Sequence, residues 1–127
     1  MTQQTPVILW FRRDLRLADH RALTAAVHSG RPVIPVFIYD PLTQSLGAAA
    51  KFRLSLSLAA LAADLAGLGS RLILRRGPAL QVLRELAAEL GAREIHWSRL
   101  YDPASKQRDI EVKSALQDAG FAVKSHK

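Results

Sequence analysis

The residues best suited to chemistry are crowded into one short segment near the amino terminus. Residues 10–19 read WFRRDLRLAD, so three arginines and two aspartates fall within a single predicted loop. A guanidinium group pairs with acids and also stacks on planar rings. The segment can therefore hold an anionic or a planar ligand. The alternative is a self-neutralising network, for example Arg16 paired with Asp14 or Asp19, that only fixes the loop.

Familiar catalytic and cofactor motifs do not occur in the sequence. None of the seven glycines forms a G-x-G-x-x-G or a G-x-x-x-x-G-K-[ST] pattern, which argues against a standard dinucleotide site or a P-loop. The four histidines, at positions 20, 28, 96 and 126, lack metal-ligand spacing and are expected on a helix surface, a strand and the tail. No serine lies on a nucleophile elbow, and the chain has no cysteine. We therefore expect no catalytic residue and no metal site in this chain.

The composition describes one globular domain with a basic surface. The 127 residues are 49% hydrophobic, which is enough to fill a core. The sequence contains no apolar run of transmembrane length and no signal-peptide pattern at its start, so a cytoplasmic protein without membrane contact is expected. Eighteen lysines and arginines oppose eleven acidic residues and give a net charge of +7. Such a balance favours polyanions, such as nucleic acid or phosphorylated ligands.

Hydrophobic patterning predicts five strands that alternate with four helices. The strands are expected at residues 7–11, 33–39, 71–75, 94–97 and 121–125. The helices are expected at about 20–29, 51–68, 78–90 and 103–119, with a loop at 40–50 between the second strand and the second helix. Asp19 is expected to cap the first helix, and Asp102 the last. Five leucines spaced four and three apart, at 54, 58, 61, 65 and 68, predict the buried stripe of the second helix.

This alternation predicts a three-layer, Rossmann-like, doubly wound α/β domain over residues 1–127. Right-handed crossovers place the strands in a parallel sheet, for which we expect the order 3-2-1-4-5. The strand order then reverses between the first and fourth strands, and ligands of such sheets lie beyond the carboxyl ends at that point. The loops at 12–19 and 98–102 should meet there. Pro35 lies inside the second strand and predicts an open side in its hydrogen bonding.

Four segments together resemble the amino-terminal domain of the DNA photolyase and cryptochrome family. Residues 10–23 match its signature W-F-R-R-D-L-R-L-x-D-x-x-A-L. The start of the second helix, with Lys51 where arginine is usual, the strand segment at 69–77, and residues 97–112 resemble later family segments in the same order. The resemblance covers the whole chain. Its motif positions are Arg13, Asp14, Arg16, Asp19, Trp97, Tyr101, Arg108 and Asp109.

The resemblance implies the function of the chain and its partners. Family members hold an accessory antenna chromophore in this domain, which passes excitation energy to FAD in a carboxyl-terminal helical domain. That helical domain, which also binds damaged DNA, is expected to be missing here, so the chain alone should be inactive. Its parent would be a deoxyribodipyrimidine photolyase, which repairs cyclobutane pyrimidine dimers, or a cryptochrome. The expected partners are the helical domain, damaged DNA through the parent, and a second copy of the fragment.

Departures from the family pattern bear on which chromophore is bound. Ala104 and Ser105 stand where folate-binding members tend to carry asparagine and glutamate, which weakens a methenyltetrahydrofolate assignment. Members that bind 8-hydroxy-deazaflavin or FMN hold it deeper, at the ends of the first two strands. Those two chromophores are therefore favoured, although the pocket can be empty in the fragment. The residues that match this pocket are Arg12, Phe37, Ile38, Asp40, Lys51 and Arg53.

Several simpler interpretations stay open at this point. Phe37 and Ile38 can be plain core residues, while Tyr101, Arg108 and Asp109 can merely brace a helix. His20 and Ser98 replace family asparagines, and both replacements are expected to remove an amide that braces the loops. The whole chain can instead be a stand-alone nucleotide-binding or stress-response module. A nucleic-acid-binding domain is a third interpretation, which requires arginines clustered on one face.

Overall fold

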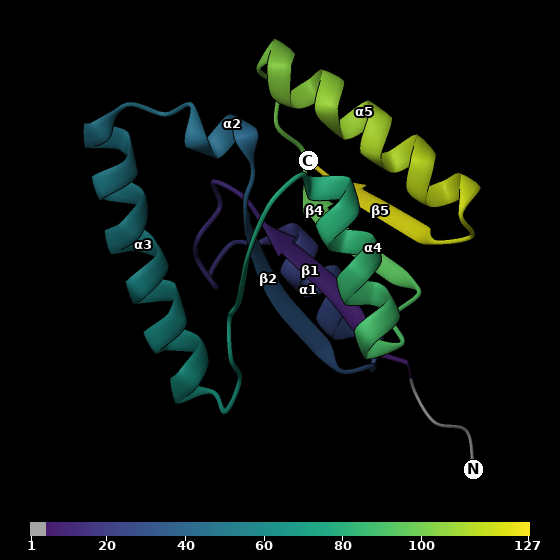
Figure 1. The fold of residues 1–127 in the computed structure, drawn as a ribbon. Helices are drawn as coiled ribbons and strands as arrows, with labels where there is room; N and C mark the ends of the chain where they lie inside the picture. The colour runs from purple at the N-terminus through teal and green to yellow at the C-terminus, as the bar shows by residue number, and fades with distance from the viewer. Residues whose placement is uncertain (1–4) are drawn as a thin grey trace.

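The computed structural model describes residues 5–127 and confirms the predicted five-stranded sheet (Figure 1). All strands are parallel, and their order is β3-β2-β1-β4-β5. The central strand is fully buried because helices cover both of its faces. The strands are β1 (Val7–Phe11), β2 (Val33–Tyr39), β3 (Ile73–Arg76), β4 (Glu94–Ser98) and β5 (Ala122–His126).

Side chains that alternate along β1 divide the core into two layers. Ile8 and Trp10 pack with the buried residues of α4 (Ala79–Leu90) and α5 (Pro103–Asp118). Leu9 and Phe11 pack on the opposite face with α1 (Arg21–His28) and the second half of α3 (Ala48–Gly67). Successive strand residues point to opposite faces, so this five-residue strand supports both layers. Within residues 5–127, no helix is long and apolar enough to cross a membrane.

Two helix boundaries differ from the sequence prediction. The expected loop at 40–50 contains α2 (Pro41–Gln44), which Asp40 caps by accepting from the Thr43 amide, and α3 already begins at Ala48. Asp19 does not cap α1, because its φ of 49° places it in the left-handed region just before the helix. His20 is the N-cap instead. A four-residue helix is too short to show periodicity, which is why the pattern missed α2.

The leucine stripe predicted for α3 is only partly buried. Leu61 and Leu65 contact the core, whereas Leu68 lies just past the last helical residue and is 73% exposed. Phe52 and Leu56, near the start of the helix, are also exposed. Only the second half of α3 therefore packs on the sheet. The first half stands beside the carboxyl edge, where it can line a pocket.

Pro35 lies where the sheet has an open side. It is opposite Leu9 of β1, but β2 pairs with β3 only from Val36 onward. The ladder on the β3 side therefore starts one residue after the proline. Since proline has no amide hydrogen to donate, this position suits it.

Candidate functional site

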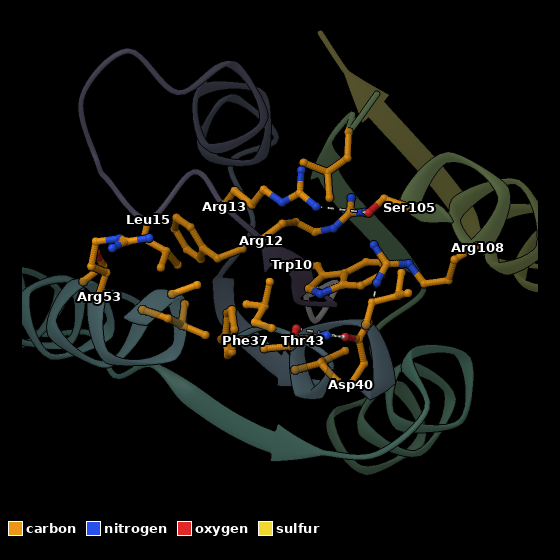
Figure 2. A pocket seen from close by; sticks show the side chains of 18 residues that line it. Trp10, Arg12, Arg13, Leu15, Phe37, Asp40, Thr43, Arg53, Ser105 and Arg108 are labelled. Atoms are coloured by element: carbon orange, nitrogen blue, oxygen red, sulfur yellow. Dashed lines mark hydrogen bonds and ion pairs between the residues drawn. The ribbon is translucent and has the colours of Figure 1, made fainter. Parts of the chain in front are cut away.

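A pocket opens at the carboxyl ends of β1 and β2, bordered by α2 and the first turns of α3 and α5 (Figure 2). Its volume is about 390 Å³. We call it the antenna-side pocket. Its lining residues are Trp10, Phe11, Arg12, Arg13, Leu15, Phe37, Ile38, Asp40, Leu42, Thr43, Leu46, Ala50, Arg53, Leu54, Ser57, Leu100, Ser105 and Arg108.

The floor of the antenna-side pocket is apolar and consists of well-packed side chains. Phe11 and Phe37 are register partners at the ends of β1 and β2, and both are buried. Trp10 and Ile38 are also buried, and both belong to the core cluster on the α4 and α5 side. A planar ring can lie against such a surface without ordering flexible side chains, so the floor suits a flat ligand.

Arg12 is the charged residue most deeply built into this site. Its side chain is 3% exposed; Nη1 donates to the Ser98 carbonyl at 3.0 Å, and Nη2 contacts both Asp109 carboxylate oxygens at 2.5 Å. Its guanidinium carbon lies 4.1 Å from the centre of the Trp10 ring. Burial lowers the pKa of Arg12, although Asp109 opposes this shift. The buried Nε has no hydrogen-bond partner within residues 5–127.

A second ion pair ties α5 to the end of β2. Arg108 donates to the buried Asp40, and its Nε donates to Asp109 at 3.0 Å. The Arg108 guanidinium also lies 5.1 Å from the centre of the Trp10 ring. Trp10 therefore contacts two cations, and Trp97 packs edge-on against it at 5.1 Å. These contacts hold the N-terminal half of α5 against the pocket.

Five of the six residues expected to bind a chromophore line this pocket. Arg12, Phe37, Ile38 and Asp40 come from the ends of β1 and β2, and Arg53 reaches the pocket from α3. The sixth, Lys51, lies outside the lining although it is on the same helix as Arg53. Their role in binding stays a prediction.

His20 braces the β1–α1 loop, contrary to the expectation that its side chain would weaken that brace or lie on the helix surface. Its buried Nδ1 accepts from the Leu23 amide at 3.0 Å, so the proton of the neutral ring is on Nε2. That Nε2 lies 2.6 Å from Asp14, which also accepts from the Arg12 amide. Burial opposes ionisation of Asp14, but hydrogen bonds from His20, Ser98 and the Arg12 amide outweigh it and lower its pKa to about 2.

The pairing of Arg16 with Asp14 or Asp19, given as an example of the alternative interpretation of the loop, does not form. Arg16 is exposed and donates only to the carbonyl oxygens of Ala18 and Asp19, each at 3.1 Å. Arg13 is exposed as well and pairs with Asp102, the N-cap of α5, at 2.8 Å. Arg12 directly follows the last residue of β1 and so continues its alternation onto the face of Trp10, whereas Arg16 lies in the loop beyond the strand. That signal was present in the sequence and identifies the buried arginine.

Two histidines that are 30 residues apart in sequence meet on neighbouring strands. His96 Nδ1 and His126 Nε2 are 3.0 Å apart, and His96 Nε2 lies 2.7 Å from Glu94, which also pairs with Arg31. Burial, followed by the proximity of His96, lowers the pKa of His126. Within residues 5–127, no group of three such side chains has a geometry that would hold a metal ion.

The fold and this pocket define a doubly wound α/β domain that can hold a flat ligand at the carboxyl edge of its central strands. Residues 7–127 match the family model for DNA photolyase, so the chain belongs to the DNA photolyase family. It is 48% identical over 120 residues to a deoxyribodipyrimidine photo-lyase of Agrobacterium fabrum, covering 94% of this chain and 25% of that protein. It is 40% identical over 122 residues to cryptochrome-1 of Arabidopsis thaliana, covering 93% of this chain and 18% of that protein.

Solved structures show the same relationship. A bacterial class III photolyase from Agrobacterium tumefaciens superposes with a TM-score of 0.93 at 44% identity, covering 99% of this chain and 26% of that one. A cryptochrome from Synechocystis superposes with a TM-score of 0.87 at 29% identity, covering 98% of this chain and 28% of that one. An archaeal photolyase from Sulfolobus tokodaii, described with two FAD molecules, superposes with a TM-score of 0.83 at 32% identity. The match covers 97% of this chain and 29% of that one.

The chain spans about a quarter of the length of these relatives. It corresponds to the antenna-binding domain of a photolyase or a cryptochrome. The matches do not favour the alternative of a stand-alone nucleotide-binding or stress-response module, because these five relatives are photolyases and cryptochromes.

Proposed function

We propose that the antenna-side pocket binds 8-hydroxy-deazaflavin or FMN as a light-harvesting chromophore, in preference to methenyltetrahydrofolate. The observation that carries this proposal is a pocket with an apolar floor whose lining also holds the cationic side chains of Arg12 and Arg53. A flavin-type ring offers both a flat apolar face and polar edge atoms that accept hydrogen bonds. The two FAD molecules of the archaeal relative also support a flavin ring system.

Each lining element has a part in this proposal. Phe37 and Ile38 contact the ring face, while Arg12 supplies a positive charge beside it. Arg53, and Lys51 if its side chain swings inward, bind an acidic tail. When bound, the chromophore supplies light absorption and transfers its excitation energy to FAD. Ala104 offers a folate no hydrogen bond, and the Ser105 hydroxyl already lies 3.4 Å from Arg13.

Filling the pocket tests its assignment. Ser57 lines the antenna-side pocket, and Ser55 is two residues away on α3 outside the lining. We expect Ser57→Trp to abolish FMN binding measured by flavin fluorescence anisotropy, because the indole occupies the pocket. Ser55→Trp is the matched control and should bind as the unaltered chain does. Equal binding by both variants would place the flavin elsewhere.

The chromophore itself is best identified in the parent protein. We expect mass spectrometry of the full-length protein, purified from its own host, to find a deazaflavin or FMN in addition to FAD. Recovery of a reduced folate as the sole accessory chromophore would overturn the preference.

For the parent protein, the proposal is light-driven repair of cyclobutane pyrimidine dimers, in the cytoplasm, with damaged DNA as substrate. The support is the 48% identity to a deoxyribodipyrimidine photo-lyase. Cryptochrome photoreception is the second candidate, since cryptochrome-1 of Arabidopsis thaliana is 40% identical. An assay of dimer repair by the illuminated full-length protein distinguishes the two: repair supports the photolyase assignment, and its absence supports the cryptochrome assignment.

The helical domain of the parent is the partner proposed for the exposed apolar side chains. Tyr101 and Leu46 are exposed near the carboxyl edge of the sheet, where docking was expected, and Phe52 and Leu56 extend this surface along α3. Without that partner, the isolated chain should self-associate. Sedimentation velocity at increasing concentration tests this, and a monomer at every concentration would contradict it.

A further inference from the structure

Two histidines form a titratable pair on the face of the sheet that α1 covers. Ile95 and Trp97 of β4 belong to the core layer under α4 and α5, so strand alternation turns His96 to the opposite face, where α1 packs on β4 and β5. The ring of His126 is stacked on that of His96, with centroids 5.2 Å apart and 6° between the ring planes. We call these two residues the histidine pair.

Hydrogen bonds fix where the protons of the uncharged histidine pair lie. Arg31 contacts one carboxylate oxygen of Glu94 at 2.7 Å and keeps this acid ionised, so the other oxygen accepts from His96 Nε2, also at 2.7 Å. Nδ1 of the neutral His96 ring then carries no hydrogen and accepts from His126 Nε2 at 3.0 Å. Each ring therefore donates in the same direction, from His126 through His96 to Glu94.

This arrangement can hold one extra proton but not two. A proton added at Nδ1 of His126 leaves Nε2 of that ring donating to His96. A second proton has to enter at Nδ1 of His96, where it would turn the 3.0 Å contact into two opposed donors. It would also place like charges in two stacked rings, one of which is only 3% exposed to water. Full protonation therefore requires the rings to separate.

The surroundings of the histidine pair are cationic on balance. Burial, followed by the proximity of His96, lowers the pKa of His126. Three further groups act in the same direction: His20, Arg99 and Lys124. Glu94 is the acid in contact with the pair, and it is shared with Arg31, while β1 places the apolar Leu9 beside His96. The charged or titratable residues of α1 are exposed: Arg21 and His28.

We propose that the histidine pair is a pH-sensitive latch, which holds the end of β5 on the sheet and releases it when both rings are protonated. A backbone bond beside the pair reports on this release. The Arg99 amide donates to the His126 carbonyl at 2.7 Å, so movement of His126 away from His96 should loosen that bond. Neither histidine lines the antenna-side pocket, and the latch does not depend on the chromophore assignment.

The direction of the pH effect follows from proton linkage. The folded chain binds a proton at His126 less readily than the unfolded chain, whose histidines have an ordinary pKa of 6.5. The unfolded chain therefore carries more protons below about pH 6.5, and the folded state loses stability as the pH falls through that region. At about pH 7.5 neither state is protonated, and the latch is closed.

Hydrogen exchange of the Arg99 amide, followed by NMR, tests the latch in the unaltered chain. Between about pH 7.5 and about pH 5.5 the protection factor, corrected for the intrinsic exchange rate, should fall about tenfold, since a shift of one pKa unit corresponds to that factor. Amides in the buried strand β1 should keep their protection over the same range. Constant protection at Arg99 would overturn the proposal.

Two matched substitutions locate the titrating group. His126→Gln keeps an amide that can donate to His96 but cannot be protonated, so Arg99 protection should become independent of pH. His28→Gln removes an exposed histidine of α1 and should behave as the unaltered chain does. A full pH response in His126→Gln, or its loss in His28→Gln, would contradict the latch. The measurement on the unaltered chain is decisive even where a variant fails to fold.

Discussion

The guanidinium of Arg12 is hydrogen-bonded at Nη1 and Nη2, stacked on Trp10, and free only at Nε within the described residues. Removing Arg12 leaves the largely buried Asp109 carboxylate with Arg108 as its remaining ion-pair partner among residues 5–127. Breaking such a pair costs more than forming it contributes, because a desolvated charge stays behind. The arginine thus has a structural role that is separate from any contact with a chromophore.

Substitution of two arginines in the same segment should have very different effects. We expect Arg12→Ala to lower the free energy of unfolding by about 3 kcal/mol or more. Arg16→Ala should cost under about 1 kcal/mol, because its exposed guanidinium contacts only two carbonyl groups. Urea unfolding followed by circular dichroism measures both. Similar midpoints for the two variants would contradict the assignment of Arg12 as the buried member.

Asp14 should make stability depend on pH in the acid range. Its pKa is about 2 in the folded chain against an ordinary value of 3.8, so the unfolded state binds more protons between these values. The stabilisation is complete above about pH 5, amounts to about 2 kcal/mol, and is lost as the pH falls toward about 2. Asp14→Asn should therefore be less stable than the unaltered chain at about pH 7, with a difference that shrinks near about pH 2.5. A constant difference across that range would show that Asp14 titrates normally.

At the scale of single elements, α3 has two halves with different roles. Leu61 and Leu65 pack on Phe11 and Leu9 of β1, while the first half lines the antenna-side pocket and exposes Phe52 and Leu56. The second half therefore anchors the helix. The first half of α3 has no fully buried residue within the described chain. Its position therefore depends on the packing of the second half.

Truncation of α3 leucines should reveal this division. Leu61→Ala should cost about 2–4 kcal/mol, because Leu61 is 1% exposed and leaves a cavity against β1. Leu68→Ala should change the free energy of unfolding by less than about 0.5 kcal/mol, although both leucines fit the same sequence stripe. Chemical denaturation of the two variants measures the difference. A comparable loss at Leu68 would mean that the end of α3 is packed.

The sequence predicted the sheet correctly because strand and helix periods, glycine stops and crossover handedness all agree on one topology. The prediction from sequence failed where tertiary contacts decide between two neighbouring residues for the same local role. Both Asp19 and His20 can cap a helix by residue type, but only the buried position of His20, beside Asp14, decides between them. The candidate site shows the same limit. Arg12, Arg13 and Arg16 are the same residue type, and only burial at the end of β1 distinguishes Arg12 from the other two.

At the scale of the whole molecule, the carboxyl edge of the sheet carries two unlike surfaces. The antenna-side pocket has an apolar floor and lies over β1 and β2. A second cavity, lined by Arg16, Arg21 and Arg99 among others, is charged and lies between the β1–α1 and β4–α5 loops. Both are supported by the β1–α1 loop, so the Asp14–His20 brace affects their shapes together.

The 127-residue chain should repair no pyrimidine dimers by itself. It spans about a quarter of its relatives, and the resemblance assigns both FAD and the lesion site to the helical domain of the parent. We expect irradiated DNA to keep its dimers under near-ultraviolet or blue light when this chain is the only protein present. The full-length protein in the same assay is the positive control. Light-dependent loss of dimers with the chain alone would contradict the expectation.

The placement of the tryptophans makes the domain its own optical reporter. Trp10 and Trp97, the two tryptophans of the chain, are both buried and in edge-on contact, and Trp10 lines the antenna-side pocket. A chromophore bound there would lie within energy-transfer range of all the indole emission of the protein. Pocket occupancy can therefore be followed without a label, as quenching of intrinsic fluorescence and sensitised emission from the ligand.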